Sequence, residues 1–224
     1  EARGKHLLVW FEGGRALHTH MQMSGSWHVY RPGERWRASP AAARIVLEVP
    51  DAVAVCFRAP VVELLDALAV RAHPRLSALG PDLCSPAADL GEALARLERL
   101  PPDTPIAVAL LDQRVACGVG NVYKSETLFA CRVHPFARVG DLDGAARRGL
   151  LAKASELLRR NLEDGRRVTY EGGLAVYRRA GRPCRRCGAT IRSARQGQPP
   201  RTTYWCPACQ PEVGRTPSAL EGPG

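Results

Sequence analysis

Four cysteines near the end of the chain have the spacing of a metal site. Cys184 and Cys187 form one C-x2-C pair, and Cys206 and Cys209 form a second pair after 18 intervening residues. Two such pairs can hold four thiolates in a tetrahedron, the geometry that zinc prefers, and four protein ligands leave no open position for catalysis. The spacing therefore predicts one structural Zn2+. Disulfides or a redox pair are weaker alternatives, because we expect a cytosolic chain.

The run LLDQRVACGVGNVYKSETLF, residues 110–129, could bind a phosphate group. Two predicted helices flank residues 117–120, whose glycines permit positive φ angles and close backbone approach. Asn121 is expected at the N-cap of the second helix, where free amides and the helix dipole attract an anion. Lys124 falls in the same first turn, where a cation opposes the dipole unless a phosphate is bound. The alternative is an ordinary helix hairpin with an asparagine cap.

Two kinds of element must position these residues. Residues 5–62 are expected to form short β-strands separated by Gly, Pro and Asp, a pattern typical of an antiparallel sandwich or barrel. The apolar spacing then becomes helical, with candidate helices in 88–100, 105–116, 121–133 and 141–165. Residues 190–194 and 201–206 predict a β-hairpin between the two cysteine pairs.

The charge of the chain suggests a polyanionic partner. Lys and Arg total 32 against 22 acidic residues, a net charge of +10, which favours nucleic acid over solubility alone. Only three of the cations are lysines, Lys5, Lys124 and Lys153. No window is long and apolar enough to span a membrane, and no secretory signal opens the chain, so a cytoplasmic location is expected.

Taken together, these runs resemble the formamidopyrimidine-DNA glycosylase/endonuclease VIII family of base-excision repair enzymes. The resemblance covers essentially the whole chain and rests on these segments: RGKHLL (3–8), HTHMQMSGSW (18–27), residues 110–129, VYRRAGRPCRRCG (176–188) and RTTYWCPACQ (201–210). It implies an α+β multidomain fold with the following parts: a remnant of an N-terminal β-sandwich catalytic domain (1–70), a helix–two-turns–helix DNA-binding domain (71–165), a linker (166–182), a β-hairpin zinc finger (183–211) and a disordered tail (212–224).

The resemblance also implies a mechanism and roles for single residues. In the family an N-terminal proline amine attacks the sugar of an extruded nucleotide, and a Schiff base then leads to β- and δ-elimination. Lys5 matches a phosphate-contacting lysine assigned as proton donor in β-elimination, and Arg201 matches a hairpin arginine assigned to phosphate binding and δ-elimination. Asn121 matches a phosphate-binding asparagine. Gln22 and Met23 match a loop that enters the duplex beside the extruded base, although core packing is an alternative for Met23.

Two departures from the family pattern shape the expected function. No Pro-Glu pair precedes Lys5, so we expect a truncated form that lacks the nucleophile segment; a non-catalytic relative that recognises damaged or abasic DNA is the alternative. Residues 59–64, APVVEL, lack the arginine and phenylalanine typical of the branch acting on oxidised purines. This favours the endonuclease VIII branch, with oxidised pyrimidines and abasic sites as substrates. A generic zinc-ribbon protein would leave the glycine turn unexplained.

The expected partner is double-stranded DNA with a damaged base or an abasic site. The resemblance implies a monomer that works on the nucleoid in the bacterial cytoplasm.

Overall fold

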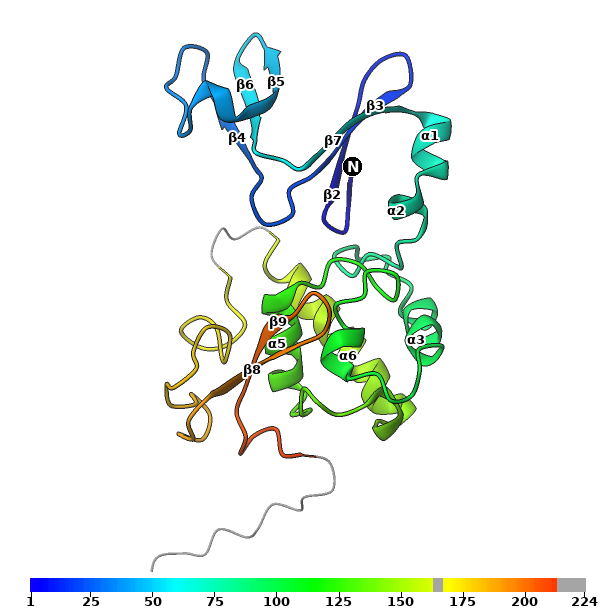
Figure 1. The fold of residues 1–224 in the computed structure, drawn as a ribbon, viewed down its shortest axis with the longest axis vertical. Coiled ribbons are helices and arrows are strands. Elements are labelled where there is room, and N and C mark those ends of the chain that lie inside the picture. Colours follow the sequence, from blue (N-terminus) through cyan, green and yellow to red (C-terminus); the bar gives the residue numbers. More distant parts are fainter. Residues whose placement is uncertain (163–166, 213–224) are drawn as a thin grey trace, which may run out of the picture. The chain divides into compact units, whose positions relative to one another are not determined.

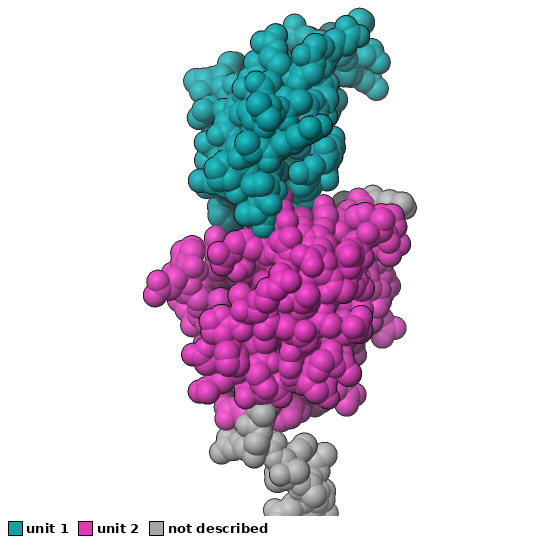
Figure 2. All heavy atoms as spheres, turned by 90° about the vertical axis from the view of Figure 1, so that its right-hand side faces the viewer, with its two compact units in different colours: residues 1–78 teal, residues 79–224 magenta. Residues whose placement is uncertain are grey.

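The chain divides into two units in the computed structural model, which describes residues 1–162 and 167–212. Unit 1 spans Glu1–Ala78 and unit 2 spans Leu79–Gly224 (Figure 2). The division lies eight residues beyond the boundary expected at residue 70. The four helices that the sequence predicts and the two cysteine pairs all lie in unit 2.

Unit 1 is built from two antiparallel sheets (Figure 1). One has the order β1-β2-β3-β7 and the other the order β4-β6-β5. This confirms the expected antiparallel β structure. The strands are β1 (Ala2–Arg3), β2 (His6–Trp10), β3 (Arg15–His20), β4 (Ser26–Tyr30), β5 (Ala43–Val49), β6 (Ala52–Phe57) and β7 (Val61–Asp66).

The chain passes from one sheet to the other at two loops that touch. A side chain at Gly25 would place its Cβ 2.9 Å from Ala59 Cα and 3.0 Å from Met21 Cα, so only glycine allows this approach. Arg58 takes a positive φ of 50° between β6 and β7, and its carbonyl accepts a hydrogen bond from Ser24 Oγ at 3.3 Å. Residues 15–30 and residues 52–66 therefore each form two strands with a break between them.

Two short helices close unit 1. They are α1 (Ala67–Ala72) and α2 (Pro74–Ser77). Asp66 caps α1 by accepting a hydrogen bond from Ala69 N at 2.7 Å. His73 lies between the two helices, and its Nδ1 accepts from Leu76 N at 3.3 Å.

Unit 2 is mostly helical. Its core is a cluster of buried aliphatic side chains from every one of its helices. No helix in the described residues of the chain is long and apolar enough to cross a membrane. Its helices are α3 (Leu90–Glu98), α4 (Ile106–Ala109), α5 (Asn121–Ala130) and α6 (Gly144–Arg159). The helix expected over 105–116 is much shorter, because it ends at Ala109 and turns follow from residue 110.

A β-hairpin packs on α5. Strands β8 (Arg192–Gln196) and β9 (Arg201–Trp205) pair antiparallel, as the sequence predicted. Beneath the hairpin a second apolar cluster joins Phe129 of α5 to Ile191, Cys184 and Cys206.

Candidate nucleic-acid interface and metal centre

Helix α5 begins directly after the glycine turn. Gly120 is its N-cap, with φ −116° and ψ −177°, and no side chain caps the helix. Asn121 is thus the first helical residue and not the N-cap that the sequence suggested. Gln113 fixes the turn: its Nε2 donates to the carbonyls of Leu111 and Val119, both at 2.9 Å, and its Oε1 accepts from Gly118 N at 3.2 Å.

Strand β9 is bonded to the start of α5. Asn121 Nδ2 donates to Thr202 O at 2.8 Å, and Lys124 Nζ donates to Thr203 Oγ1 at 2.7 Å. The neighbouring Arg201 is exposed. Arg201 therefore comes directly before the residue that is bonded to the N-terminus of α5, whose dipole carries a partial positive charge. The fold brings together Asn121, Lys124 and Arg201 across about 80 residues of sequence.

Lys124 differs from its expected place. Its side chain is completely buried, and burial, together with the nearby charge of Arg201, lowers the pKa of Lys124 to about 8. In this arrangement the ammonium holds the hairpin through Thr203 and is not presented to a ligand. The sequence offered Lys124 as a DNA-binding candidate in the first turn, and the structure places its ammonium in the interior, bonded to the hairpin.

Glu126 is a site residue that the sequence did not indicate. It is 1% exposed, and its carboxylate accepts hydrogen bonds from Ala175 N at 2.8 Å, Val176 N at 2.9 Å and Tyr177 N at 2.8 Å, and from the Thr169 hydroxyl. One carboxylate thus fastens the segment before the cysteine pairs to α5. No local signal marks Glu126, because its partners lie 43 to 51 residues away.

The four cysteines form the cluster that their spacing predicted. The Sγ–Sγ distances are 4.0 Å for Cys184–Cys209, 3.5 Å for Cys187–Cys206 and 3.4 Å for Cys187–Cys209. Four thiolates about 2.3 Å from a tetrahedral ion would be about 3.8 Å apart, close to these values. The backbone N–H of Arg186 also donates to Cys184 Sγ at 3.4 Å. The cluster could hold one metal ion.

The candidate residues of unit 1 lie at exposed turns. Lys5 lies in the turn between β1 and β2, and Gln22 and Met23 lie in the loop after β3. Gln22 has a positive φ of 45°, and Met23 is 84% exposed. Core packing, the alternative for Met23, does not apply in this arrangement.

Comparisons with known proteins agree with this arrangement. The family model described as the formamidopyrimidine-DNA glycosylase H2TH domain matches residues 79–171. A probable endonuclease 8 2 of Streptomyces coelicolor is 45% identical over 98% of this chain and 81% of its own length. The DNA-(apurinic or apyrimidinic site) lyase Nei2 of Mycolicibacterium smegmatis is 39% identical over 93% of this chain and 80% of its own length.

Solved structures show the same fold. Lactococcus lactis Fpg in complex with DNA containing an abasic site superposes with a TM-score of 0.79 at 22% identity, covering 95% of this chain and 80% of that chain. Because curated relatives share 39–45% identity over nearly the whole chain, the chain belongs to the formamidopyrimidine-DNA glycosylase/endonuclease VIII family.

Proposed function

We propose that the protein is a base-excision repair DNA glycosylase and abasic-site lyase that holds the DNA backbone with Arg201 and the start of α5. The observation that carries this proposal is the attachment of β9 to α5 through Asn121–Thr202 and Lys124–Thr203. It gives the exposed guanidinium of Arg201 a rigid support. Arg is suited to phosphate because its planar fork donates two parallel hydrogen bonds, and a helix N-terminus attracts the same anion.

The exposed residues of unit 1 would act on the sugar and the base stack. Lys5 would contact phosphate and supply a proton during β-elimination. Met23 would enter the duplex as an apolar wedge with Gln22 beside it, since apolar side chains stabilise unstacked base steps. The exposure of all three residues supports these roles.

The favoured lesions are oxidised pyrimidines and abasic sites. Ala59 and Pro60 lead directly into β7, so this segment offers neither the arginine nor the phenylalanine of the purine-specific branch. Relatives named endonuclease 8 and DNA-(apurinic or apyrimidinic site) lyase support the same choice. We infer that the protein works as a monomer on the nucleoid in the bacterial cytoplasm, because chromosomal DNA is the proposed substrate.

The four-cysteine cluster would hold one structural Zn2+. The near-tetrahedral sulfur spacing supports zinc, and four thiolates leave it no open position for substrate. When bound, the ion stabilises a hairpin whose own apolar cluster is small. Cys184, Cys187, Cys206 and Cys209 would thereby keep β9 in place on α5.

A binding assay tests the phosphate contact. Arg201→Ala should weaken binding to an abasic-analogue duplex by about tenfold, and should reduce the slope of log K against log salt by about 1. Arg148→Ala, an exposed arginine on α6, removes the same charge elsewhere and should leave both values unchanged. Equal losses of DNA affinity in Arg201→Ala and Arg148→Ala would mean that binding depends only on the net charge of the protein.

Borohydride trapping tests the chemistry separately. The protein expressed from its natural start codon should form a covalent cross-link with an abasic-site duplex, because borohydride reduces the Schiff base of the lyase reaction. Binding to the abasic duplex with no cross-link would overturn the enzymatic proposal. It would instead favour the alternative of a non-catalytic relative that recognises damaged DNA.

A further inference from the structure

Four of the six histidines of the chain gather in unit 1. His6 of β2 lies 5.1 Å from His18 and 4.4 Å from His20, both on β3, measured between ring centroids. His73, between α1 and α2, lies 5.1 Å from His18. Glu63 of β7 pairs directly with His18 across the sheet. Its carboxylate joins His73 to the other three histidines of this cluster.

Three donor atoms of this cluster converge. Glu63 Oε2 lies 2.8 Å from His18 Nδ1 and 3.2 Å from His73 Nε2. All three atoms lie within 4.8 Å of one another. His18 is completely buried, so one donor is held without access to bulk water.

We propose that His18, Glu63 and His73 bind one divalent transition-metal ion, with Zn2+ as the ion that fits best. Two imidazoles and one carboxylate form a ligand set that zinc accepts. Ligands about 2.0–2.1 Å from a tetrahedral ion lie about 3.3 Å apart. The two separations from Glu63, 2.8 and 3.2 Å, are close to that value, and the two imidazole nitrogens lie within 4.8 Å of each other.

The surroundings can orient both imidazoles. His18 Nε2 lies 2.8 Å from His6 Nδ1, so a metal on Nδ1 leaves Nε2–H to donate to His6. Metal on His73 Nε2 requires a proton on Nδ1, which would displace the 3.3 Å bond from Leu76 N. That loss is small, because Leu76 N also donates to His73 O at 3.0 Å.

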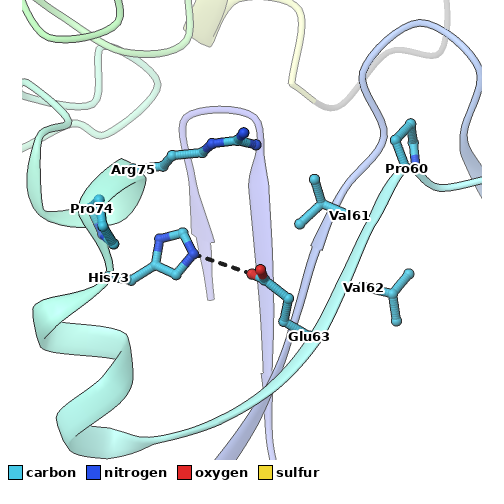
Figure 3. Close-up of a pocket in the computed structure, with 7 residues that line it drawn as sticks. All are labelled: Pro60, Val61, Val62, Glu63, His73, Pro74 and Arg75. Carbon is cyan, nitrogen blue, oxygen red and sulfur yellow. Dashed lines mark hydrogen bonds and ion pairs between the residues drawn. The ribbon is translucent and has the colours of Figure 1, made fainter.

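The fourth position of the ion would face a cavity. The cavity has a volume of about 360 Å³, and the carboxylate of Glu63 reaches His73 at its wall (Figure 3). Arg75 also lines this cavity and would repel a bare cation. An anionic oxygen, such as hydroxide, is therefore the favoured fourth ligand.

Metal counting tests the proposal. After zinc loading and dialysis, the full chain should retain about two zinc ions by mass spectrometry, one in the cysteine cluster and one in the histidine cluster. Glu63→Gln and His73→Ala should retain about one ion. His28→Ala removes a histidine of the other sheet and should still retain two. His6→Ala should weaken the second site by about 10–100-fold in competition with a chromophoric chelator.

Nitrogen-15 NMR of the histidine rings gives a readout on the unchanged protein. Zinc should change the 15N chemical shifts of His18 Nδ1 and His73 Nε2, while the chemical shifts of both ring nitrogens of His28 stay the same. A protein that retains one zinc ion and shows no shift at His18 and His73 would overturn the proposal. The cluster would then be a hydrogen-bonded network alone.

Discussion

Lys124 carries a positive charge that the fold removes from water. Its side chain is fully buried, and its ammonium donates to a neutral partner, the Thr203 hydroxyl, at 2.7 Å. Burial without a carboxylate partner favours the neutral amine, so the pKa falls from 10.5 to about 8. Lys124 therefore holds the hairpin in place at a cost to stability at neutral pH.

This cost predicts a particular pH dependence of stability. Below pH 8 both the folded and the unfolded states hold the proton, and the penalty is present in full. Between about pH 8 and 10.5 the folded protein releases a proton that the unfolded chain keeps, so the free energy of unfolding rises with pH by an amount on the order of 3 kcal/mol. Lys124→Met should lack this rise, which urea unfolding at several pH values would measure. If the free energy of unfolding changes with pH in the same way in Lys124→Met and in the unchanged protein, the ammonium of Lys124 remains hydrated in the folded state.

Helix α5 is the element on which unit 2 is assembled. Every residue of α5 from Lys124 through Phe129 is buried, because the helix contacts α6, α4 and β9 and also receives the segment after residue 167. Glu126 makes the last of these attachments, and three of its four hydrogen bonds come from consecutive backbone amides. Removing the carboxylate charge should therefore loosen a whole segment and not one contact.

Glu126→Gln tests this attachment. The amide NH2 that replaces one carboxylate oxygen cannot accept, so at least two buried donors lose their acceptor, and unfolding should become about 2–4 kcal/mol easier. Hydrogen exchange at Ala175, Val176 and Tyr177 should accelerate. Glu171→Gln makes the same chemical change at an exposed carboxylate of that segment and should have little effect. Unchanged exchange in Glu126→Gln would contradict the anchoring role.

The sequence predicted elements with local signals and missed those set by distant contacts. The hairpin, the cysteine cluster and helices α3, α5 and α6 follow from spacing and periodicity. The breaks at Gly25 and Arg58 have no comparable local signal, because they arise where two loops 34 residues apart come together. Likewise, Lys124 and Glu126 look like ordinary helix charges, and only partners 43 to 79 residues away explain their burial.

At the scale of the whole molecule, the cysteine cluster and α5 support the same strand from opposite ends. Cys206 follows β9 immediately, whereas Thr202 and Thr203 near its start are bonded to α5. Arg201 thus depends on both supports for its position. Unit 1 has its own two sheets and its own apolar cluster, so we expect its strands to persist without the cysteines of unit 2.

Loss of the ion proposed for the cysteine cluster should therefore affect the two units differently. Replacing one of its proposed ligands in Cys187→Ser should expose the amides of β8 and β9 to hydrogen exchange and weaken abasic-DNA binding at least as much as Arg201→Ala, because the whole hairpin is released. Amides of β2, β3 and β7 should stay protected in Cys187→Ser. Cys131→Ser replaces a half-buried cysteine of unit 2 outside the cluster and should keep both the metal and the binding. If Cys187→Ser loses its metal and hairpin protection yet binds DNA normally, the cysteine cluster only stabilises the hairpin, and Arg201 does not hold the backbone.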